Sequence, residues 1–317
     1  MSFAKILETT APIYLIIAGG YLSVRLGLFE QRDTRALGRY VAAFCIPALL
    51  FDALSSRPLA EIANLRYLGA YGAASMAVLL ATFRVQTSLR RQPAPKAAIQ
   101  GLGMSSSNSA FIGYPIAAQA FGHPAAVALA LNMILENGIM LPLALALAGS
   151  GDLRTRSFSR FADSLRGLER NPMMLVLVAG FAVSAFGIPL PAVVTRTVRL
   201  VSSAASPVAL FVIGGSLVGL SLQGMRRDVG AIVAGKLLLH PLAVLAAMCL
   251  VAPIDPTLAQ SGVILAAAPM MSIYAVLGQR YELQGLCAAA LLATTTVSFV
   301  SISAWMAVLH AIGVAAA

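Results

Sequence analysis

Asn108-Ser-Ala-Phe-Ile-Gly113-Tyr-Pro115 interrupts an apolar stretch from Ala97 to Leu135, in which His123 is the only acidic or basic side chain. A stretch of this length fits two membrane spans, because one span needs about 20 mostly apolar residues. Asn, Gly and Pro break the first of these spans near its middle. Lipid cannot hydrogen-bond a freed backbone group, so such a break survives only inside protein or along a cavity. Broken helices of this kind are typical of transporter binding sites.

The composition of the whole chain is that of a membrane protein. Of 317 residues, 59% are hydrophobic and only 11% are charged, and the mean hydropathy is +0.85, whereas a soluble domain is about 25% charged. We expect an all-α protein with ten transmembrane helices; nine or eleven stay open if a short segment lies at the interface. The charge-poor segments are Thr9–Val24, Arg35–Ala53, Tyr67–Phe83, Ala97–Phe121, Pro124–Gly149, Pro172–Gly187, Leu200–Met225, Leu237–Pro253, Pro256–Gln279 and Gly285–Ala311.

The net charge of +10 follows from the orientation of the spans and requires no nucleic-acid partner. Cytoplasmic loops of membrane proteins carry an excess of Lys and Arg. With both termini outside the cytoplasm, most basic residues fall in loops on the inner side, where they also meet anionic membrane lipid. We therefore expect an integral protein of a bacterial inner (plasma) membrane. The inner-side residues include Arg25, Arg32, Arg35, Arg39, Arg84, Arg90, Arg91, Lys96, Arg226 and Arg227.

The two halves of the chain resemble each other. Pro47 opens Pro-Ala-Leu-Leu-Phe in the second span and Pro207 opens Pro-Val-Ala-Leu-Phe in the seventh, and Pro115 and Pro269 follow at similar separations. Five is an odd number of spans, so the second half enters the membrane from the opposite side. This predicts two inverted five-helix repeats, 1–148 and 171–317, joined by a cytoplasmic linker, 149–170. Inverted repeats occur in several transporters, NhaA among them.

Two helices broken near the membrane midplane, and crossing there, bring half-helix ends together. Amino-terminal helix ends carry partial positive charge and free N–H groups, which favours an anionic substrate group such as a carboxylate. The Asn108 amide can donate to the same group, although it can also simply cap the kink. Glycines at the breaks permit close backbone approach or simply aid helix packing. The candidate substrate-binding residues are Asn108, Ser107, Gly113, Pro115, Gly262, Pro269 and Ser272.

Two ionisable side chains inside spans are candidates for ion coupling. Glu136 is the only carboxylate well inside a span, and Asn132 lies one turn earlier, so the two could take up a proton or help to hold a cation. A protonated Glu136 that hydrogen-bonds between helices is the alternative. His240 lies at the Pro241 kink with Lys236 one turn earlier, and the two could serve a proton relay or attract an anion from the cytoplasm. A lysine so near a span end more often extends its ammonium to the water interface.

The sequence contains no pattern typical of an enzyme, a metal site or a cofactor site. There is no HExxH, glycine-rich phosphate loop or GxSxG motif, and His123, His240 and His310 belong to different spans or loops. The three cysteines are odd in number and lie in apolar spans, which favours small core residues over disulfides. We therefore expect no enzyme activity, no metal and no cofactor.

Several segments together resemble the auxin efflux carrier family, which includes plant PIN auxin carriers and bacterial carriers similar to malonate transporters. They are Cys45-Ile-Pro47-Ala-Leu-Leu-Phe, Asn108-x4-Gly113-x-Pro115 and Ala-Ala-Ala268-Pro269. The resemblance covers the whole chain and, without a long central loop, fits the compact bacterial type. It implies that spans one, two, six and seven form a dimerising scaffold, and that the others form a mobile domain with crossing broken helices four and nine. Substrate contacts would then fall on Asn108 and the backbone around Pro115 and Pro269.

These observations predict a secondary transporter of a small organic anion that works by alternating access. The anion would be a mono- or dicarboxylate, malonate- or auxin-like. Three alternatives remain open on the sequence: a sodium- or proton-coupled carrier of another solute on the same fold, a membrane receptor that binds without transport, and a channel.

Overall fold

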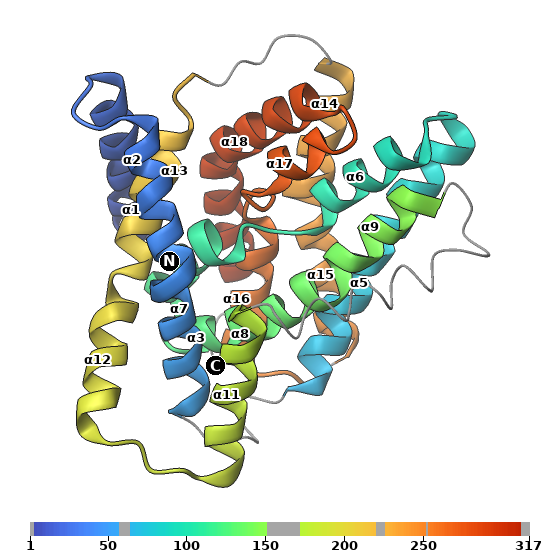
Figure 1. Ribbon diagram of the computed structural model, residues 1–317. Helices are drawn as coiled ribbons and strands as arrows, with labels where there is room; N and C mark the ends of the chain where they lie inside the picture. Colours follow the sequence, from blue (N-terminus) through green and yellow to red (C-terminus); the bar gives the residue numbers. More distant parts are fainter. Residues whose placement is uncertain (1–2, 57–63, 151–171, 220–225, 252, 312–317) are drawn as a thin grey trace.

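The computed structural model describes residues 3–56, 64–150, 172–219, 226–251 and 253–311, and within these ranges the chain is helical and contains no strand (Figure 1). This confirms the all-α prediction. The predicted linker, 149–170, lies almost entirely outside the described residues. Six helices are long and apolar enough to cross a membrane: Gln31–Ser55, Leu65–Leu89, Pro124–Gly149, Ala192–Ser216, Arg227–Leu250 and Gln284–Ala311.

Helices and short π-helical turns, labelled η, follow one another along the described chain. The first group is α1 (Phe3–Arg25), α2 (Gln31–Tyr40), η1 (Val41–Cys45), α3 (Ile46–Ser55), α5 (Leu65–Arg84), η2 (Val85–Leu89), α6 (Ala94–Ser105), η3 (Ser109–Gly113), α7 (Tyr114–Phe121), α8 (Pro124–Leu135), η4 (Glu136–Met140) and α9 (Leu141–Ser150). The second is α11 (Pro172–Phe186), α12 (Ala192–Ser203), α13 (Ala205–Ser216), α14 (Arg226–Ala234), η6 (Gly235–Leu239), α15 (His240–Leu250), α16 (Pro256–Ala267), α17 (Tyr274–Gln279) and α18 (Gln284–Ala311).

Four prolines account for four of the π-helical turns. Pro47, Pro115, Pro142 and Pro241 each stand two residues after the last residue of η1, η3, η4 and η6. Proline lacks a backbone N–H, and its ring crowds the carbonyl four residues earlier. A wider turn before the proline relieves that crowding while the helix continues. The helices around Pro47, Pro142 and Pro241 therefore stay long enough to cross a membrane, with a kink in the middle.

Two of the predicted spans are broken rather than kinked. Helix α6 ends at Ser105 and η3 begins at Ser109, while α16 ends at Ala267 and α17 begins at Tyr274. The pieces cross: η3 and α7 pack against α16, and α17 packs against α6. At the crossing, the Asn108 N–H donates to the Pro269 carbonyl oxygen at 2.6 Å. The halves are too short to count among the six long apolar helices, which is the expected consequence of a break.

The helices form two groups that lie side by side (Figure 1). One group contains α1, α2, α3, α11, α12 and α13, with α1 against α13 and with α3 against α11 and α12. Gly20 and Gly214 make the α1–α13 contact close, because each lies directly against a backbone carbonyl of the other helix. The second group contains α5 to α9 and α14 to α18.

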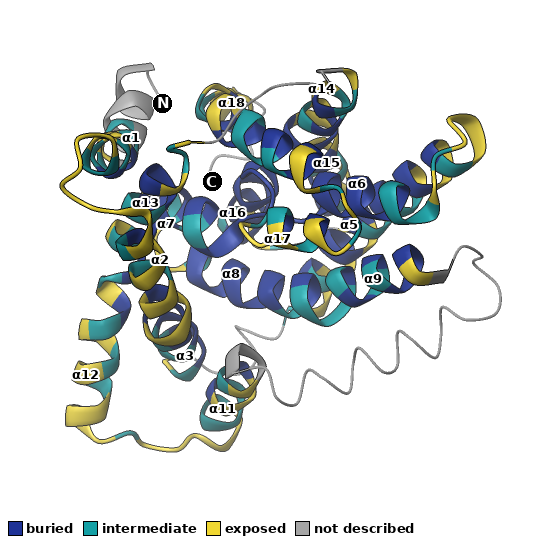
Figure 2. Ribbon diagram, turned by 45° about the horizontal axis from the view of Figure 1, so that its top comes forward, coloured by how far each residue is buried: buried dark blue, intermediate teal, exposed yellow. Residues whose placement is uncertain are grey.

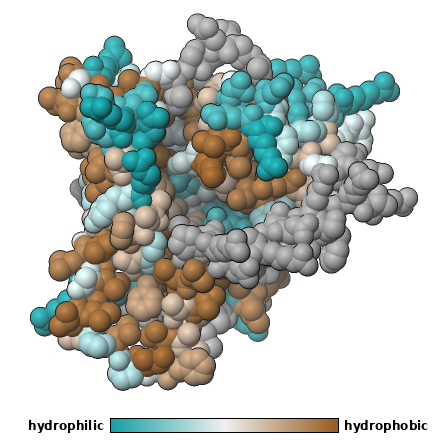
Figure 3. All heavy atoms as spheres, viewed as in Figure 1, coloured by the Kyte–Doolittle hydropathy of each residue, from teal (hydrophilic) through white to brown (hydrophobic). Residues whose placement is uncertain are grey.

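Burial and hydropathy follow this arrangement. Figure 2 shows α8 and α16 almost wholly buried at the centre, whereas α12 is largely exposed. The exposed side chains of α12 are apolar in several places, and Val193 and Leu200 are 76% and 75% exposed. Figure 3 shows hydrophilic side chains gathered at the upper end of the molecule and apolar ones over much of the lower part. An apolar belt below a charged end is what a bilayer requires.

Candidate functional site

A cavity of about 320 Å³ lies between the two groups of helices, where α2 and α13 face the two breaks. One wall comes from α2 and α13, and the other comes from Phe111 of η3 and Ser272 of the second break. Most of the lining is apolar, and its charged groups belong to α2. The lining residues are Thr34, Arg35, Gly38, Arg39, Ala42, Phe111, Val212, Ile213, Ser216 and Ser272.

Asn108 lies behind the cavity lining, bonded to the lining residue Ser272, and joins the two breaks. Its side-chain amide donates to Ser272 Oγ at 2.8 Å, and its backbone N–H donates to Pro269. Its side-chain oxygen also accepts from the Phe111 N–H at 3.3 Å, which caps η3. Of the two roles that the sequence left open, the structure shows the cap, and the same side chain also bonds to the partner break; donation to a substrate anion stays a prediction. Ser272 is exposed to the cavity, whereas Asn108 is only 5% exposed.

Ser107 faces away from the cavity although it is the neighbour of Asn108. The chain is extended at Ser106, with φ −118° and ψ 145°, and successive side chains of an extended chain point to opposite sides. Asn108 thus meets Ser272, while Ser107 and Ser109 meet the interior of the second helix group. One short segment connects the cavity with a buried polar cluster behind it.

Glu136 forms the acidic part of that cluster. Its Oε1 accepts from the Ser107 N–H at 3.1 Å and from Ser109 Oγ at 2.7 Å, and the side chain is 3% exposed. The carboxylate lies at the amino-terminal end of η3, where helix N–H groups favour an anion. The sequence predicted that such an end favours a substrate carboxylate; at η3 the protein's own carboxylate lies there.

Lys236 forms the basic part of the cluster and does not extend to the water interface. Its side chain is fully buried, and Nζ donates to Ser107 Oγ at 2.7 Å, His240 Nδ1 at 2.8 Å and the Ala266 carbonyl at 2.6 Å. An ammonium has three N–H donors, so these acceptors satisfy all of them. Ala266 lies at the carboxyl-terminal end of α16, where the helix dipole favours a cation. The expectation that Lys236 reaches water was wrong.

His240 continues the cluster toward α5. Since Nδ1 accepts from Lys236, the proton of a neutral ring lies on Nε2, which then donates to Ser75 Oγ at 2.9 Å. The ring also packs edge-on against Tyr71, with centroids 5.8 Å apart. A connected path of hydrogen-bonding groups therefore runs from Glu136 through Ser107, Lys236 and His240 to Ser75.

Asn132 lies beside this path rather than on it. Its Oδ1 accepts from Tyr67 Oη at 3.0 Å, while its Nδ2 and the Tyr71 hydroxyl are buried without a hydrogen-bond partner among the described residues. Buried polar groups normally find partners. The Asn132 amide is therefore only partly satisfied, through its bond with Tyr67.

The glycines among the candidate residues serve helix contacts. A Cβ on Gly113 would lie 2.8 Å from Leu265 Cδ2 and 3.3 Å from Leu265 Cα, so the glycine lets α16 approach the first break. Gly262 faces the ring of Tyr67, whose Cε2 would lie 2.8 Å from an added Cβ. Pro115 is buried in α7 and shapes the turn before it.

Sequence reasoning missed four residues of this region. Ser75 and Ser109 carried no signal, because serine is common in membrane helices and usually bonds to its own helix. Arg35 and Arg39 were read only as topology markers, since their place in a cavity depends on how α2 packs against the breaks. Among the described residues, no group of three or more His, Cys, Asp or Glu side chains is placed to hold a metal ion.

Comparison with known proteins agrees with this geometry. The family model described as "Membrane transport protein" matches residues 5–306. The chain belongs to this family. This confirms the resemblance to the auxin efflux carriers. With its six long apolar helices, the chain is an integral membrane protein.

Two bacterial relatives show how far the similarity extends. A protein of Rhizobium meliloti (strain 1021) named "Putative malonate transporter" is 28% identical over 302 residues, which cover 95% of this chain and 94% of the relative. A protein of Escherichia coli (strain K12) named "Uncharacterized transporter YfdV" is 25% identical over 245 residues, 74% of this chain and 75% of the relative.

Proposed function

We propose that this protein is a secondary transporter of a small organic anion, a mono- or dicarboxylate, and that it works by alternating access. One observation carries the proposal: two broken helices meet at the Asn108–Ser272 pair, and Ser272 lines a cavity to which α2 contributes two arginines. An amide donor binds a carboxylate without carrying a buried charge of its own. The Rhizobium relative's name adds malonate as a substrate to test.

The architecture that we propose has ten transmembrane helices in two inverted five-helix repeats. The group of α1 to α3 and α11 to α13 would be the scaffold, and α5 to α9 with α14 to α18 the mobile domain. This assignment fits the cavity between the groups and the break segments on the mobile side. We further propose that both termini lie outside the cytoplasm of a bacterial inner membrane, and that two copies associate through the scaffold.

We propose that the buried cluster couples substrate movement to protons. Glu136 and His240 are its titratable members, and Lys236 holds them in one network through Ser107. Asn132 would adjust with Tyr67 when the network rearranges. The membrane potential determines how much energy coupling must supply, because moving each negative charge inward against 100 mV costs about 2.3 kcal/mol. Efflux can run without coupling, whereas uptake needs a proton or another cation.

Flux through reconstituted protein tests the proposal. We expect sealed proteoliposomes to accumulate radiolabelled malonate when a pH gradient, acidic outside, is imposed. A sodium gradient should have no such effect. Asn108→Ala should raise the half-saturation concentration about 10-fold or more, because a hydrogen bond to a charged group contributes about 1.5–3 kcal/mol.

Asn137→Ala is the matched control. Asn137 lies in the same helix group, but its amide donates to the Met133 carbonyl of its own helix at 3.0 Å. This variant should keep wild-type flux. Equal flux and affinity for Asn108→Ala and wild type would rule out Asn108 as a binding residue. Sodium-driven accumulation would instead favour a sodium-coupled carrier.

A further inference from the structure

Two arginines of α2 add positive charge to the cavity, and the site at Asn108 and Ser272 described so far does not involve them. Arg35 and Arg39 are four residues apart and both line the cavity, across from Phe111 and Ser272. Residues at this spacing lie on one face of a helix, one turn above the other. No acidic residue belongs to the cavity lining. The side chains of Arg35 and Arg39 therefore line a space to which the protein contributes no carboxylate.

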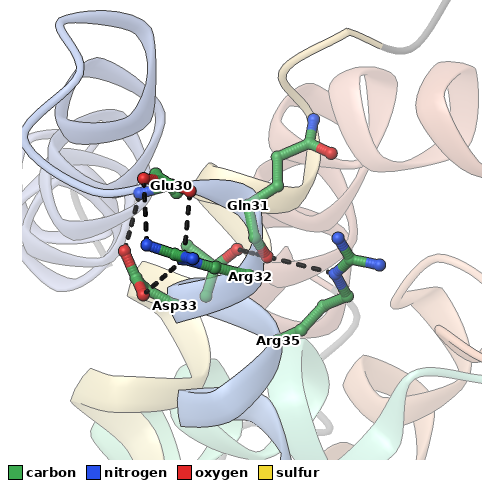
Figure 4. Close-up of polar contacts among 6 residues, drawn as sticks. Glu30, Gln31, Arg32, Asp33 and Arg35 are labelled. Carbon is green, nitrogen blue, oxygen red and sulfur yellow. Dashed lines mark hydrogen bonds and ion pairs between the residues drawn. The ribbon is translucent and has the colours of Figure 1, made fainter.

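Figure 4 shows that this contrasts with the neighbouring arginine. Arg32 forms ion pairs with Glu30 at 3.0 Å and Asp33 at 3.9 Å. Arg35 extends away from that group, and its Nε donates to the Gln31 carbonyl at 3.2 Å. In the part of the chain that the structure describes, neither Arg35 nor Arg39 is paired with an acidic side chain. The acids at the start of α2 neutralise Arg32 and leave the two cavity arginines available.

We propose that Arg35 and Arg39 bind one carboxylate of a dicarboxylate substrate while its other carboxylate binds at Asn108 and Ser272. This inference rests on the proposed function and names its substrate class. A guanidinium matches a carboxylate with two parallel N–H donors, which a lysine ammonium cannot do. The two binding ends come from opposite walls of the cavity, so one molecule with two anionic ends can contact both.

The rest of the cavity suits the spacer between two carboxylates. Ala42, Phe111, Val212 and Ile213 give it an apolar middle. Its volume of about 320 Å³ is at the small end of the range of ligand pockets, about 300–1,000 Å³. A short aliphatic dicarboxylate fits this pattern of charged ends and apolar middle. A monocarboxylate binds at only one end of the cavity and makes no charged contact with the wall at the other end.

A dicarboxylate that binds at both ends of the cavity also connects substrate specificity with the movement of the two helix groups. Arg35 and Arg39 belong to the helix group that we assign to the scaffold, and Asn108 and Ser272 belong to the mobile group. A dicarboxylate contacts both groups at once, and its binding energy can therefore favour one relative position of the groups over the other. A monocarboxylate binds one group and has no such preference. Selectivity is then expected in transport rate as well as in affinity.

The test compares dicarboxylate and monocarboxylate handling in proteoliposomes. We expect Arg39→Gln and Arg35→Gln each to raise the half-saturation concentration for radiolabelled malonate at least 10-fold. Competition by propionate, which has one carboxylate, should stay within twofold of wild type. Arg39→Lys should recover only part of the malonate affinity, because it restores the charge without the paired donors.

Arg32→Gln is the control, since Arg32 is paired outside the cavity and should leave malonate transport unchanged. Thermal unfolding followed by Trp305 fluorescence checks that each variant is folded. If the double variant R35Q/R39Q kept wild-type malonate affinity, or lost malonate and propionate binding equally, the two-ended site would be refuted. Failure of the wild-type protein to move either anion would instead overturn the proposed function itself.

Discussion

Ser107 brings two opposite charges to a single residue of the first break. Its N–H donates to Glu136, and its hydroxyl accepts from Lys236. Neither charge lies in water, and each is held by groups that suit it, the carboxylate at a helix amino terminus and the ammonium at a helix carboxyl terminus. Buried ions need both a counter-charge and satisfied hydrogen bonds. We therefore expect the groups of the cluster to stabilise one another, so that removing one of them destabilises the others.

This interdependence predicts non-additive mutations. Lys236→Met and Glu136→Gln each leave a buried polar partner in the Ser107 network without its hydrogen bond, so each single change should cost about 1–3 kcal/mol. The double variant E136Q/K236M removes both charges and should unfold at a higher temperature than either single variant. Thermal unfolding of the wild type, the two single variants and the double variant in detergent gives the double-mutant cycle.

Transport by the same variants tests the role of the cluster. The double variant should still bind malonate, because Asn108, Ser272 and the α2 arginines are intact, but it should no longer accumulate malonate in response to a pH gradient. Additive losses of stability would mean that Glu136 and Lys236 act separately. A retained pH response would remove both residues from the coupling mechanism.

At the scale of elements, the breaks and kinks could be predicted because their causes are local. Proline and glycine restrict or free the backbone wherever they occur, so Pro115 and Pro269 mark changes of helix direction in the sequence itself. The burial of Lys236 could not be predicted in this way. Its three acceptors are Ser107 of the first break, His240 of α15 and Ala266 of α16. Only the packing of these segments shows that an ammonium can be satisfied there.

Gly113 provides a test of the crossing itself. Gly113→Ala places a methyl group 2.8 Å from Leu265 Cδ2 and 3.3 Å from its Cα, so α16 has to move away from the first break. Overpacking of this kind costs about 1–3 kcal/mol. We expect a lower unfolding temperature and slower malonate flux. Gly69→Ala is the control, since a Cβ there meets nothing within 4 Å. Equal behaviour of the two variants would show that the close approach at Gly113 is unimportant.

At the scale of the whole molecule, the positions of the basic residues and of the cavity indicate the same side of the membrane. The basic residues that predict the cytoplasmic side include Arg35 and Arg39, and these same residues line the cavity. The cavity should therefore open toward the cytoplasm in this conformation. The sequence contains the charge asymmetry, but it cannot show which side has access to the breaks, because access depends on how the two helix groups are positioned.

Chemical labelling of Ser272 tests this orientation. In a background with Cys45, Cys249 and Cys287 replaced by alanine, Ser272→Cys should react with a membrane-impermeant maleimide added to the cytoplasmic face of inverted vesicles. Saturating malonate should slow the reaction, since the substrate covers that end of the cavity. Ala128→Cys is the control, because Ala128 is fully buried in α8 and should not react.

Reagent added to right-side-out vesicles separates three outcomes. Slow labelling of Ser272→Cys from that side, increased by transported malonate, is expected of alternating access, because the same cysteine becomes reachable from each side in turn. Rapid labelling from outside together with none from inside would reverse the orientation inferred from the arginines. Rapid labelling from both sides without substrate would mean an open pore and would contradict a carrier mechanism.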